Sequence, residues 1–304
     1  MDSSLFQPSA RHVSVLLREI LAHSPASTRR ILDATVGMGG HSFALLSHHP
    51  HASVLAFDRD EHALSIARKR LEDFGDRVEF RHGDFRDGLE GIAPQSLCYA
   101  IADLGVSSLQ LDDPERGFSF RFEAPLDMRM DPSGGRSASD ILNTASEKEL
   151  ERILTDFGEE PKARAIARSI VMERRTRSRW TTSAFASLVR RDARGRPGLD
   201  PSTRSFQALR IATNLELQDL DGALDRLARL LRPGGRLAVI AFHSLEDRIV
   251  KTVFKSLKQS GAFELLTPKP EVPQDDEMRA NPRSRSAKLR VIERRGLQAA
   301  EATP

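Results

Sequence analysis

The 304-residue chain contains one cysteine, one tryptophan, one tyrosine and no long hydrophobic run. Because Cys98 is alone, an internal disulfide and a zinc site built from several cysteines are excluded, which is typical of a reducing compartment. The longest strongly apolar run spans residues 237–242, far short of the roughly 18 residues that a membrane-spanning helix needs. The segment from Met1 to Arg11 lacks the basic-then-apolar pattern of an export signal. We therefore expect a cytoplasmic protein that does not bind membranes.

The formal net charge of +3 hides a strong asymmetry along the chain. Residues 162–196 contain eleven Lys or Arg and two Asp or Glu, and residues 279–295 contain seven and one. Charge runs are often no more than solvated surface. Two dense basic segments on an otherwise acidic body nevertheless favour a protein that binds a phosphate backbone.

Short apolar runs alternate with helical patterns in the first hundred residues. The expected strands span 31–36, 54–57, 78–80, 98–104 and, much later, 237–242. Alternation of strands and helices predicts βαβ units, and therefore an α/β protein with a doubly wound, mostly parallel sheet.

The fourth and fifth expected strands are separated by residues 105–235, although a crossover between parallel strands needs only about a dozen residues. Apolar residues recur at helical spacing in 146–191, and no stretch there resembles a strand. We therefore predict a main domain formed by residues 1–112 and 211–304. A basic helical domain, 113–210, is inserted into it.

Glycine, acidic and histidine residues follow the ends of the five expected strands. In chain order they are Gly37-Met38-Gly39-Gly40-His41, Asp58, Asp84-Phe85, Asp103 and His243. In an open parallel sheet, ligands bind beyond the carboxyl ends of the strands. Asp58 lies 21 residues after Gly37, well placed to accept hydrogen bonds from both ribose hydroxyls of an adenosine. Ser42 stands where a dinucleotide fingerprint has glycine or alanine, and the Gly-Lys-Ser/Thr ending of a phosphate-binding loop is absent.

Six segments together resemble the motifs of the bacterial small-subunit rRNA cytosine-N4 methyltransferases. They are Asp33–Ser42, Asp103–Ser108, Gly117–Phe120 with Asp127–Met130, Phe206–Ile211, Phe242–Arg248 and Asn281–Arg290. The resemblance runs from His12 to about Arg295, nearly the whole chain. Ser14 and Leu109 stand where this family usually has proline, and Thr213–Leu215 also departs from its pattern.

The resemblance implies a class I, Rossmann-like methyltransferase fold with an inserted helical domain. It also implies transfer of a methyl group from S-adenosylmethionine to N4 of a decoding-centre cytidine, in 16S rRNA or in the small ribosomal subunit. By the family's pattern, the cofactor contacts fall on Gly39, Gly40, His41, Asp58, Phe85, Asp103 and Gln110. No metal is expected, because the cofactor already carries an activated methyl group.

Cytosine N4 is a poor nucleophile, so the enzyme must position the amine and offer an acceptor for its proton. The acceptor candidates are Asp103, Ser107, Ser108, Asn214 and His243. Many amino-group methyltransferases carry an Asp/Asn/Ser-Pro-Pro-aromatic segment after the fourth strand. This chain has Asp103–Val106 there, which speaks against a DNA amino-methyltransferase and favours a cofactor contact for Asp103.

The arginines of the insertion are predicted to bind the rRNA backbone. They are Arg164, Arg168, Arg174, Arg175, Arg177 and Arg179. Trp180 is expected to anchor the core of the inserted domain, because aromatic side chains are usually buried. Two other classes remain open, a nicotinamide-dependent oxidoreductase and a non-catalytic RNA-binding protein. The first would need a third glycine in the turn, and the second would leave the acidic sheet edge without a purpose.

Overall fold

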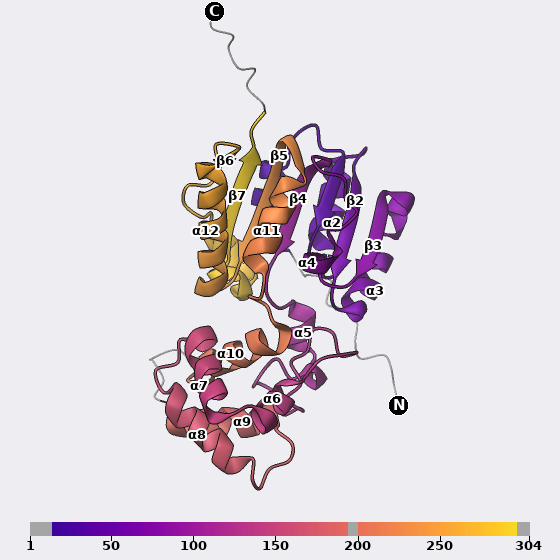
Figure 1. Ribbon diagram of the computed structural model, residues 1–304. Helices are drawn as coiled ribbons and strands as arrows, with labels where there is room; N and C mark the ends of the chain where they lie inside the picture. The colour runs from indigo at the N-terminus through magenta and orange to yellow at the C-terminus, as the bar shows by residue number, and fades with distance from the viewer. Residues whose placement is uncertain (1–13, 194–199, 297–304) are drawn as a thin grey trace, which may run out of the picture. The chain divides into compact units, whose positions relative to one another are not determined.

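The computed structural model describes residues 14–193 and 200–296 and divides the chain into two compact units (Figure 1). The first unit contains the chain up to Leu104 and again from Asp219, and the second unit is Gly105–Gln218. Both boundaries lie eight residues outside the expected insertion, 113–210. At the later boundary the reason is a pair of hydrogen bonds from Asn214 to the backbone of the second unit.

The first unit is built on one seven-stranded sheet, ordered β3-β2-β1-β4-β5-β7-β6. The strands are β1 (Arg30–Asp33), β2 (Ser53–Asp58), β3 (Val78–His82), β4 (Leu97–Asp103), β5 (Leu231–Ala241), β6 (Phe263–Leu265) and β7 (Lys288–Arg294). The first five strands are parallel, and β7 pairs antiparallel with both β5 and β6. The mostly parallel α/β sheet predicted from the sequence is confirmed.

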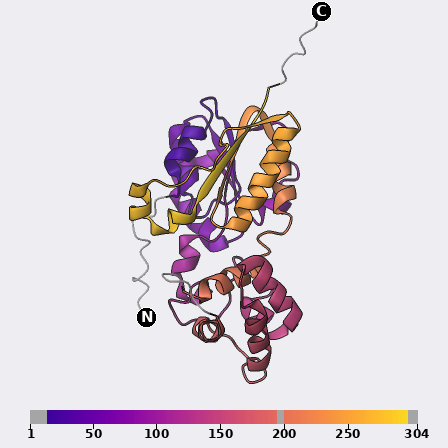
Figure 2. The same cartoon turned by 90° about the vertical axis from the view of Figure 1, so that its left-hand side faces the viewer.

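Helices cover both faces of this sheet, because parallel strands are apolar on both sides. The helices are α1 (Leu17–His23), α2 (Gly40–His48), α3 (Glu61–Arg70), α4 (Phe85–Gly88), α11 (Leu220–Arg229), α12 (Ser244–Gln259) and α13 (Asp275–Ala280). Residues of α1, α2 and α3 share one buried cluster with the sheet. Figure 2 shows the indigo helices near the N-terminus and the orange helices α11 and α12 on opposite sides of the strands.

The sequence pattern does not predict the C-terminal strands β6 and β7. In β7 the charged Arg290 interrupts the apolar residues, yet it is only 8% exposed and its Nε donates to Asp247 Oδ1 at 2.7 Å. Because a charged residue is buried in β7 through this ion pair, the apolar pattern that predicts a strand is interrupted in the sequence. The segment 267–282, between β6 and β7, contains the short helix α13.

The second unit is helical, as the pattern in residues 146–191 predicts. Its helices are α5 (Ser108–Asp112), α6 (Ala138–Thr144), α7 (Glu147–Gly158), α8 (Ala163–Glu173), α9 (Thr182–Asp192) and α10 (Ser202–Asn214). Trp180 is 1% exposed and packs edge-on against Phe185, which in turn contacts Phe206. The expected role of Trp180 as a core anchor is confirmed. Across the described ranges of both units, every helix is too short or too polar to cross a bilayer.

Candidate cofactor site

The glycine turn between β1 and α2 requires residues without a side chain. Gly37 and Gly39 have φ values of 53° and 79°, in the left-handed region that glycine tolerates best. A Cβ atom on Gly40 would overlap the hydroxyl oxygen of Ser14. The turn therefore presents bare backbone at the end of β1, where a ligand can approach closely.

Asp58, the last residue of β2, is bound to this turn. Its carboxylate accepts hydrogen bonds from the Gly37 N–H at 2.7 Å and the Asp60 N–H at 2.9 Å. Burial raises the pKa of Asp58 to about 6, although these backbone hydrogen bonds oppose the shift. The structure thus brings Asp58 to the glycine turn, and its carboxylate, with about four acceptor sites, can still accept from a ligand.

Asp103 ends β4 and carries a buried oxygen without a partner. Its backbone N–H donates to Thr35 Oγ1 at 2.7 Å, which fixes the strand end beside the glycine turn. Its Oδ2 lies 3.8 Å from His41 Nδ1, whereas Oδ1 is buried and has no hydrogen-bond partner. Burial, together with the charges of Asp33 and Glu246, raises the pKa of Asp103 to about 8.

Asp33 and Glu246 complete a group of buried carboxyls that the sequence pattern does not mark as site residues. Asp33 is 1% exposed and accepts a hydrogen bond from Ser42 Oγ at 2.6 Å, and burial raises its pKa to about 7. Glu246 is also buried and accepts from the Phe242 N–H at 2.8 Å. Acidic groups gathered in a low-dielectric site favour a cationic ligand, because a cation offsets both desolvation and mutual repulsion.

Asp84 and Phe85 have different roles after β3. Asp84 caps α4 by accepting from the Arg86 N–H at 2.9 Å, and Arg86 Nη2 lies 2.5 Å from its Oδ2. Burial alone would raise the pKa of Asp84, but the hydrogen bonds and charge of Arg86 outweigh it and lower the pKa. Asp84 therefore stabilises the loop, and Phe85, 6% exposed, packs at the start of α4.

His243 is the N-cap of α12 rather than a free acceptor. Its Nδ1 accepts from the Glu246 N–H at 3.3 Å, which completes a capping box with the Glu246 side chain. This bond assigns the ring proton to Nε2, which lies 3.2 Å from Glu246 Oε1. The lone pair of Nδ1 is therefore already used in the helix cap, and a role of His243 as acceptor of the amine proton stays a prediction.

Three further candidates, Ser107, Gln110 and Asn214, belong to the second unit. Ser107 caps α5 by accepting from the Gln110 N–H, and Gln110 Oε1 accepts from the Ser107 N–H at 3.0 Å. Ser108 is the first residue of the same helix. The hydroxyl of Ser107 and the amide of Gln110 thus hold the start of α5.

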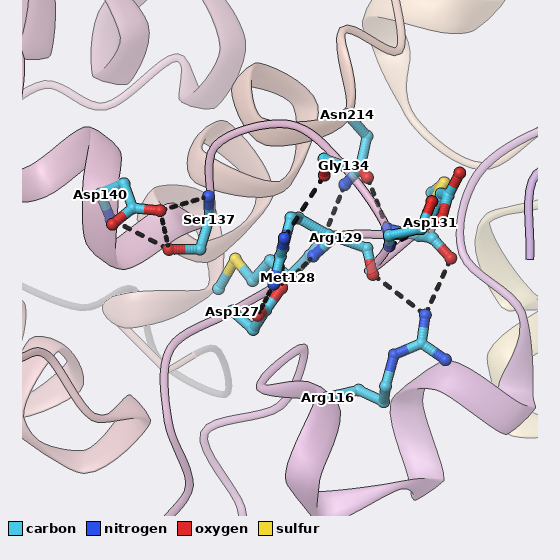
Figure 3. A network of polar contacts seen from close by, with 11 residues as sticks. Arg116, Asp127, Met128, Arg129, Asp131, Gly134, Ser137, Asp140 and Asn214 are labelled. Atoms are coloured by element: carbon cyan, nitrogen blue, oxygen red, sulfur yellow. Dashed lines mark hydrogen bonds and ion pairs between the residues drawn. The ribbon is translucent and has the colours of Figure 1, made fainter.

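Asn214 forms hydrogen bonds with the backbone of residues 128–130, a strained segment of the second unit (Figure 3). Its Oδ1 accepts from the Met130 N–H, and its Nδ2 donates to the Met128 carbonyl, both at 2.7 Å. Met128 has a φ of 63°, which a residue with a side chain rarely adopts. Arg116 donates to the carbonyls of Arg129 and Met130 from the other side. Asn214 therefore has a buried structural role, and its role as a proton acceptor stays a prediction.

The predicted RNA-binding arginines differ in their surroundings. Arg174 is half-buried and donates to the Ala145 carbonyl at 2.6 Å and the Leu142 carbonyl at 3.4 Å, so it caps the end of α6. Arg177 lies over the ring of Trp180, 5.3 Å from its centroid. The remaining four, all of them exposed, are Arg164, Arg168, Arg175 and Arg179.

The strand order, the glycine turn and the acids at the strand ends define a class I methyltransferase that uses S-adenosylmethionine. The orphaned oxygen of Asp103, near the buried carboxyls of Asp33 and Glu246, fits the positively charged sulfonium and ammonium groups of this cofactor. The chain belongs to the MraW methylase family, whose model matches residues 9–295.

Curated relatives cover nearly the whole chain. "Ribosomal RNA small subunit methyltransferase H" of Sorangium cellulosum is 48% identical over 292 residues, covering 94% of this chain and 91% of the relative. The protein of the same name from Acaryochloris marina is 49% identical over 290 residues, covering 93% and 94%. Among solved structures, an rRNA methylase from Streptococcus thermophilus aligns with a TM-score of 0.42 and 15% identity, covering 91% of this chain and 93% of that chain.

Proposed function

We propose that this protein transfers a methyl group from S-adenosylmethionine to N4 of a decoding-centre cytidine in 16S rRNA. The observation that carries the proposal is the family match over 9–295, with relatives named as small-subunit rRNA methyltransferases over more than nine-tenths of the chain. The buried acids at the sheet edge support the cofactor half of the reaction. The basic surface of the second unit supports the RNA half.

The proposed cofactor contacts begin at the glycine turn. The backbone of Gly39 and Gly40 borders the ligand, and Asp58 accepts from the ribose hydroxyls. S-adenosylmethionine supplies a methyl group activated on a positively charged sulfur. His41 and Asp103 face this charge, and Asp103 offers a buried oxygen that no protein group occupies.

Phe85, at the start of α4, and Gln110, on α5, complete the proposed contact set. Among the candidates for accepting the amine proton, Asn214 Oδ1 and His243 Nδ1 already accept hydrogen bonds from backbone N–H groups, and the Ser107 hydroxyl caps α5. Asp103 has a buried oxygen without a hydrogen-bond partner, and we propose it as the charged group in contact with the cofactor.

The proposed reaction is tested by incubating the purified protein with labelled S-adenosylmethionine and unmodified 16S rRNA, free or in small subunits. We expect N4-methylcytidine in the nucleoside digest, detected by mass spectrometry. Duplex DNA serves as the competing substrate. A methyl group found only on DNA, or on another base of the RNA, would contradict the proposal.

We expect the affinity for S-adenosylmethionine to rise with pH. With a pKa of about 8, Asp103 is protonated in the free protein at neutral pH, whereas a bound cation favours the carboxylate. Binding must therefore release a proton, and affinity increases by at most about tenfold per pH unit until it levels off above about pH 8.

Titration calorimetry from about pH 6 to about pH 9 measures this dependence. Asp103→Asn removes the titrating group and should flatten the profile while it weakens binding at high pH. S-adenosylhomocysteine, which lacks the sulfonium charge, should show a shallower profile in the unchanged protein. An affinity for S-adenosylmethionine that stays constant with pH would rule out the contact with Asp103.

Replacing Arg164 and Arg168 by alanine should weaken RNA binding without affecting the cofactor. Both side chains are exposed on α8, so the substitutions remove charge and no packing. We expect a higher KM for RNA and a salt dependence shallower by about 0.7 for each phosphate that is no longer neutralised. Arg174 is left intact because it caps α6. Unchanged RNA binding in a variant that binds the cofactor normally would show that these two arginines do not contact RNA.

A further inference from the structure

A hollow of about 460 Å³ lies in the second unit between the end of α8 and the face of α9. It is lined by Glu173, Arg177, Ser183, Ala184, Ser187, Leu188 and Arg191. Three of these residues are charged and two carry hydroxyl groups, so the hollow is polar. Of its two arginines, the sequence pattern points only to Arg177.

Two guanidinium groups converge on one carboxylate in this hollow. Arg191 Nη1 lies 2.8 Å from Glu173 Oε1, and Arg177 Nε lies 3.8 Å from Glu173 Oε2. The Arg177 Nε is buried and has no hydrogen-bond partner. Asp192 also contacts Arg191, so the cluster holds two positive and two negative charges. Donors remain for an additional acceptor, because each guanidinium has five N–H groups.

The hollow rests on rigid supports. Arg177 lies over Trp180, whose Nε1 donates to Asn143 Oδ1 at 3.0 Å within the core. Arg191 is on the last turn of α9, and Ser183 is on the first turn of the same helix. Backbone N–H groups in a first helical turn favour anions. A binding group held on packed elements loses little conformational entropy when a ligand arrives.

The surrounding segment reinforces the positive charge. Residues 162–193 contain nine Lys or Arg and two acids, Glu173 and Asp192. Both acids contact Arg191, the second through Arg191 Nε and Asp192 Oδ1 at 3.2 Å. The other basic side chains of the segment therefore add a field that attracts anions to the hollow.

We propose that this hollow binds a backbone phosphodiester of the RNA substrate, with Arg177 and Arg191 as its two cationic ligands. The inference rests on the proposed function, because it assigns one contact of that same RNA. A guanidinium matches two phosphate oxygens, and the Ser183 and Ser187 hydroxyls supply further donors. Glu173 holds the two arginines together until the phosphate competes for them.

Binding of a short single-stranded RNA oligonucleotide, followed by fluorescence anisotropy over a range of salt concentrations, tests the proposal. Arg191→Ala should raise Kd about fivefold, the equivalent of one exposed ion pair, and make the salt slope shallower by about 0.7. Glu173→Gln should lower Kd and steepen the slope, because it removes the competing carboxylate. Arg152→Ala, on the surface of α7, makes the same charge change elsewhere in the unit and should leave the slope unchanged.

Equal effects of Arg191→Ala and Arg152→Ala would overturn the site, because only net charge would then matter. If Glu173→Gln binds RNA more weakly than the unchanged protein, the Glu173 carboxylate does not compete with a phosphate for the arginines. If the hollow variants bind naked RNA normally but fail to bind assembled small subunits, the hollow contacts a ribosomal protein and not the RNA, and the proposal is wrong. If the unchanged protein neither binds nor methylates 16S rRNA, the proposed function fails and this inference fails with it. If the unchanged protein methylates 16S rRNA normally and the hollow variants bind RNA as it does, only the proposed phosphate site is rejected.

Discussion

Replacing Asn214 by alanine is expected to lower the free energy of unfolding of the second unit by about 2–6 kcal/mol. The change leaves the Met130 N–H and the Met128 carbonyl without partners in a site where Asn214 is only 3% exposed. Each unsatisfied buried polar group costs about 1–3 kcal/mol. The left-handed conformation of Met128 is also no longer held by these bonds.

Urea unfolding followed by tryptophan fluorescence measures this effect. Trp180 is the only tryptophan in the chain and lies in the core of the second unit, so its signal reports on that unit. Thr213→Ala is the matched control, because the Thr213 hydroxyl is buried on the same helix and has no hydrogen-bond partner. An Asn214→Ala midpoint equal to that of the control would show that the bonds to Met128 and Met130 contribute nothing.

The second large effect is expected at Asp58. Asp58→Ala should weaken S-adenosylmethionine binding by about ten- to a hundredfold, because hydrogen bonds to a charged group contribute about 1.5–3 kcal/mol. The structure adds a second consequence, since Asp58 also accepts from the N–H groups of Gly37 and Asp60. The glycine turn should therefore loosen, and the variant should also be less stable.

Asp60→Ala separates these two consequences. Asp60 is a buried carboxyl that caps α3 by accepting from the His62 N–H at 3.0 Å, two residues from Asp58. Removing this cap should cost about 1 kcal/mol of stability and leave cofactor affinity largely unchanged. Calorimetry on both variants is the measurement. Similar affinities for Asp58→Ala and the unchanged protein would reject the ribose contact.

Local patterns in the sequence predict the parts of the protein that depend on near neighbours. The parallel strands β1, β2, β4 and β5 appear as apolar runs because most of their residues are buried, whereas the edge strand β3 has no buried residue and gives a weaker pattern. The turn after β1 is recognisable because left-handed backbone favours glycine at Gly37 and Gly39. The position of Asp58 follows from the length of one strand–helix–strand repeat. The resemblance in six motifs leads to the same family that the comparisons show.

The sequence predicts that the second unit is helical and basic, but it does not predict the functions of individual side chains. Arg174 and Arg164 look alike in the sequence, yet only Arg174 binds the carbonyls at the end of α6. Nothing in the neighbourhood of Arg191 along the chain shows that it meets Glu173, 18 residues away. Helical periodicity in a sequence predicts which face of a helix is buried. It does not predict which residue a polar side chain will contact.

By itself, the sequence determined the alternation of strands and helices, the glycine turn, the acids at the strand ends and the family. Tertiary structure alone decided the antiparallel place of β7, the capping role of His243, the buried hydrogen bonds of Asn214, and the meeting of Asp33, Asp103 and Glu246. The physical reason is separation along the chain. Asn214 and Met128 are 86 residues apart, and Arg290 and Asp247 are 43 apart. Buried polar groups need hydrogen-bond partners, and only the folded chain brings such distant partners together.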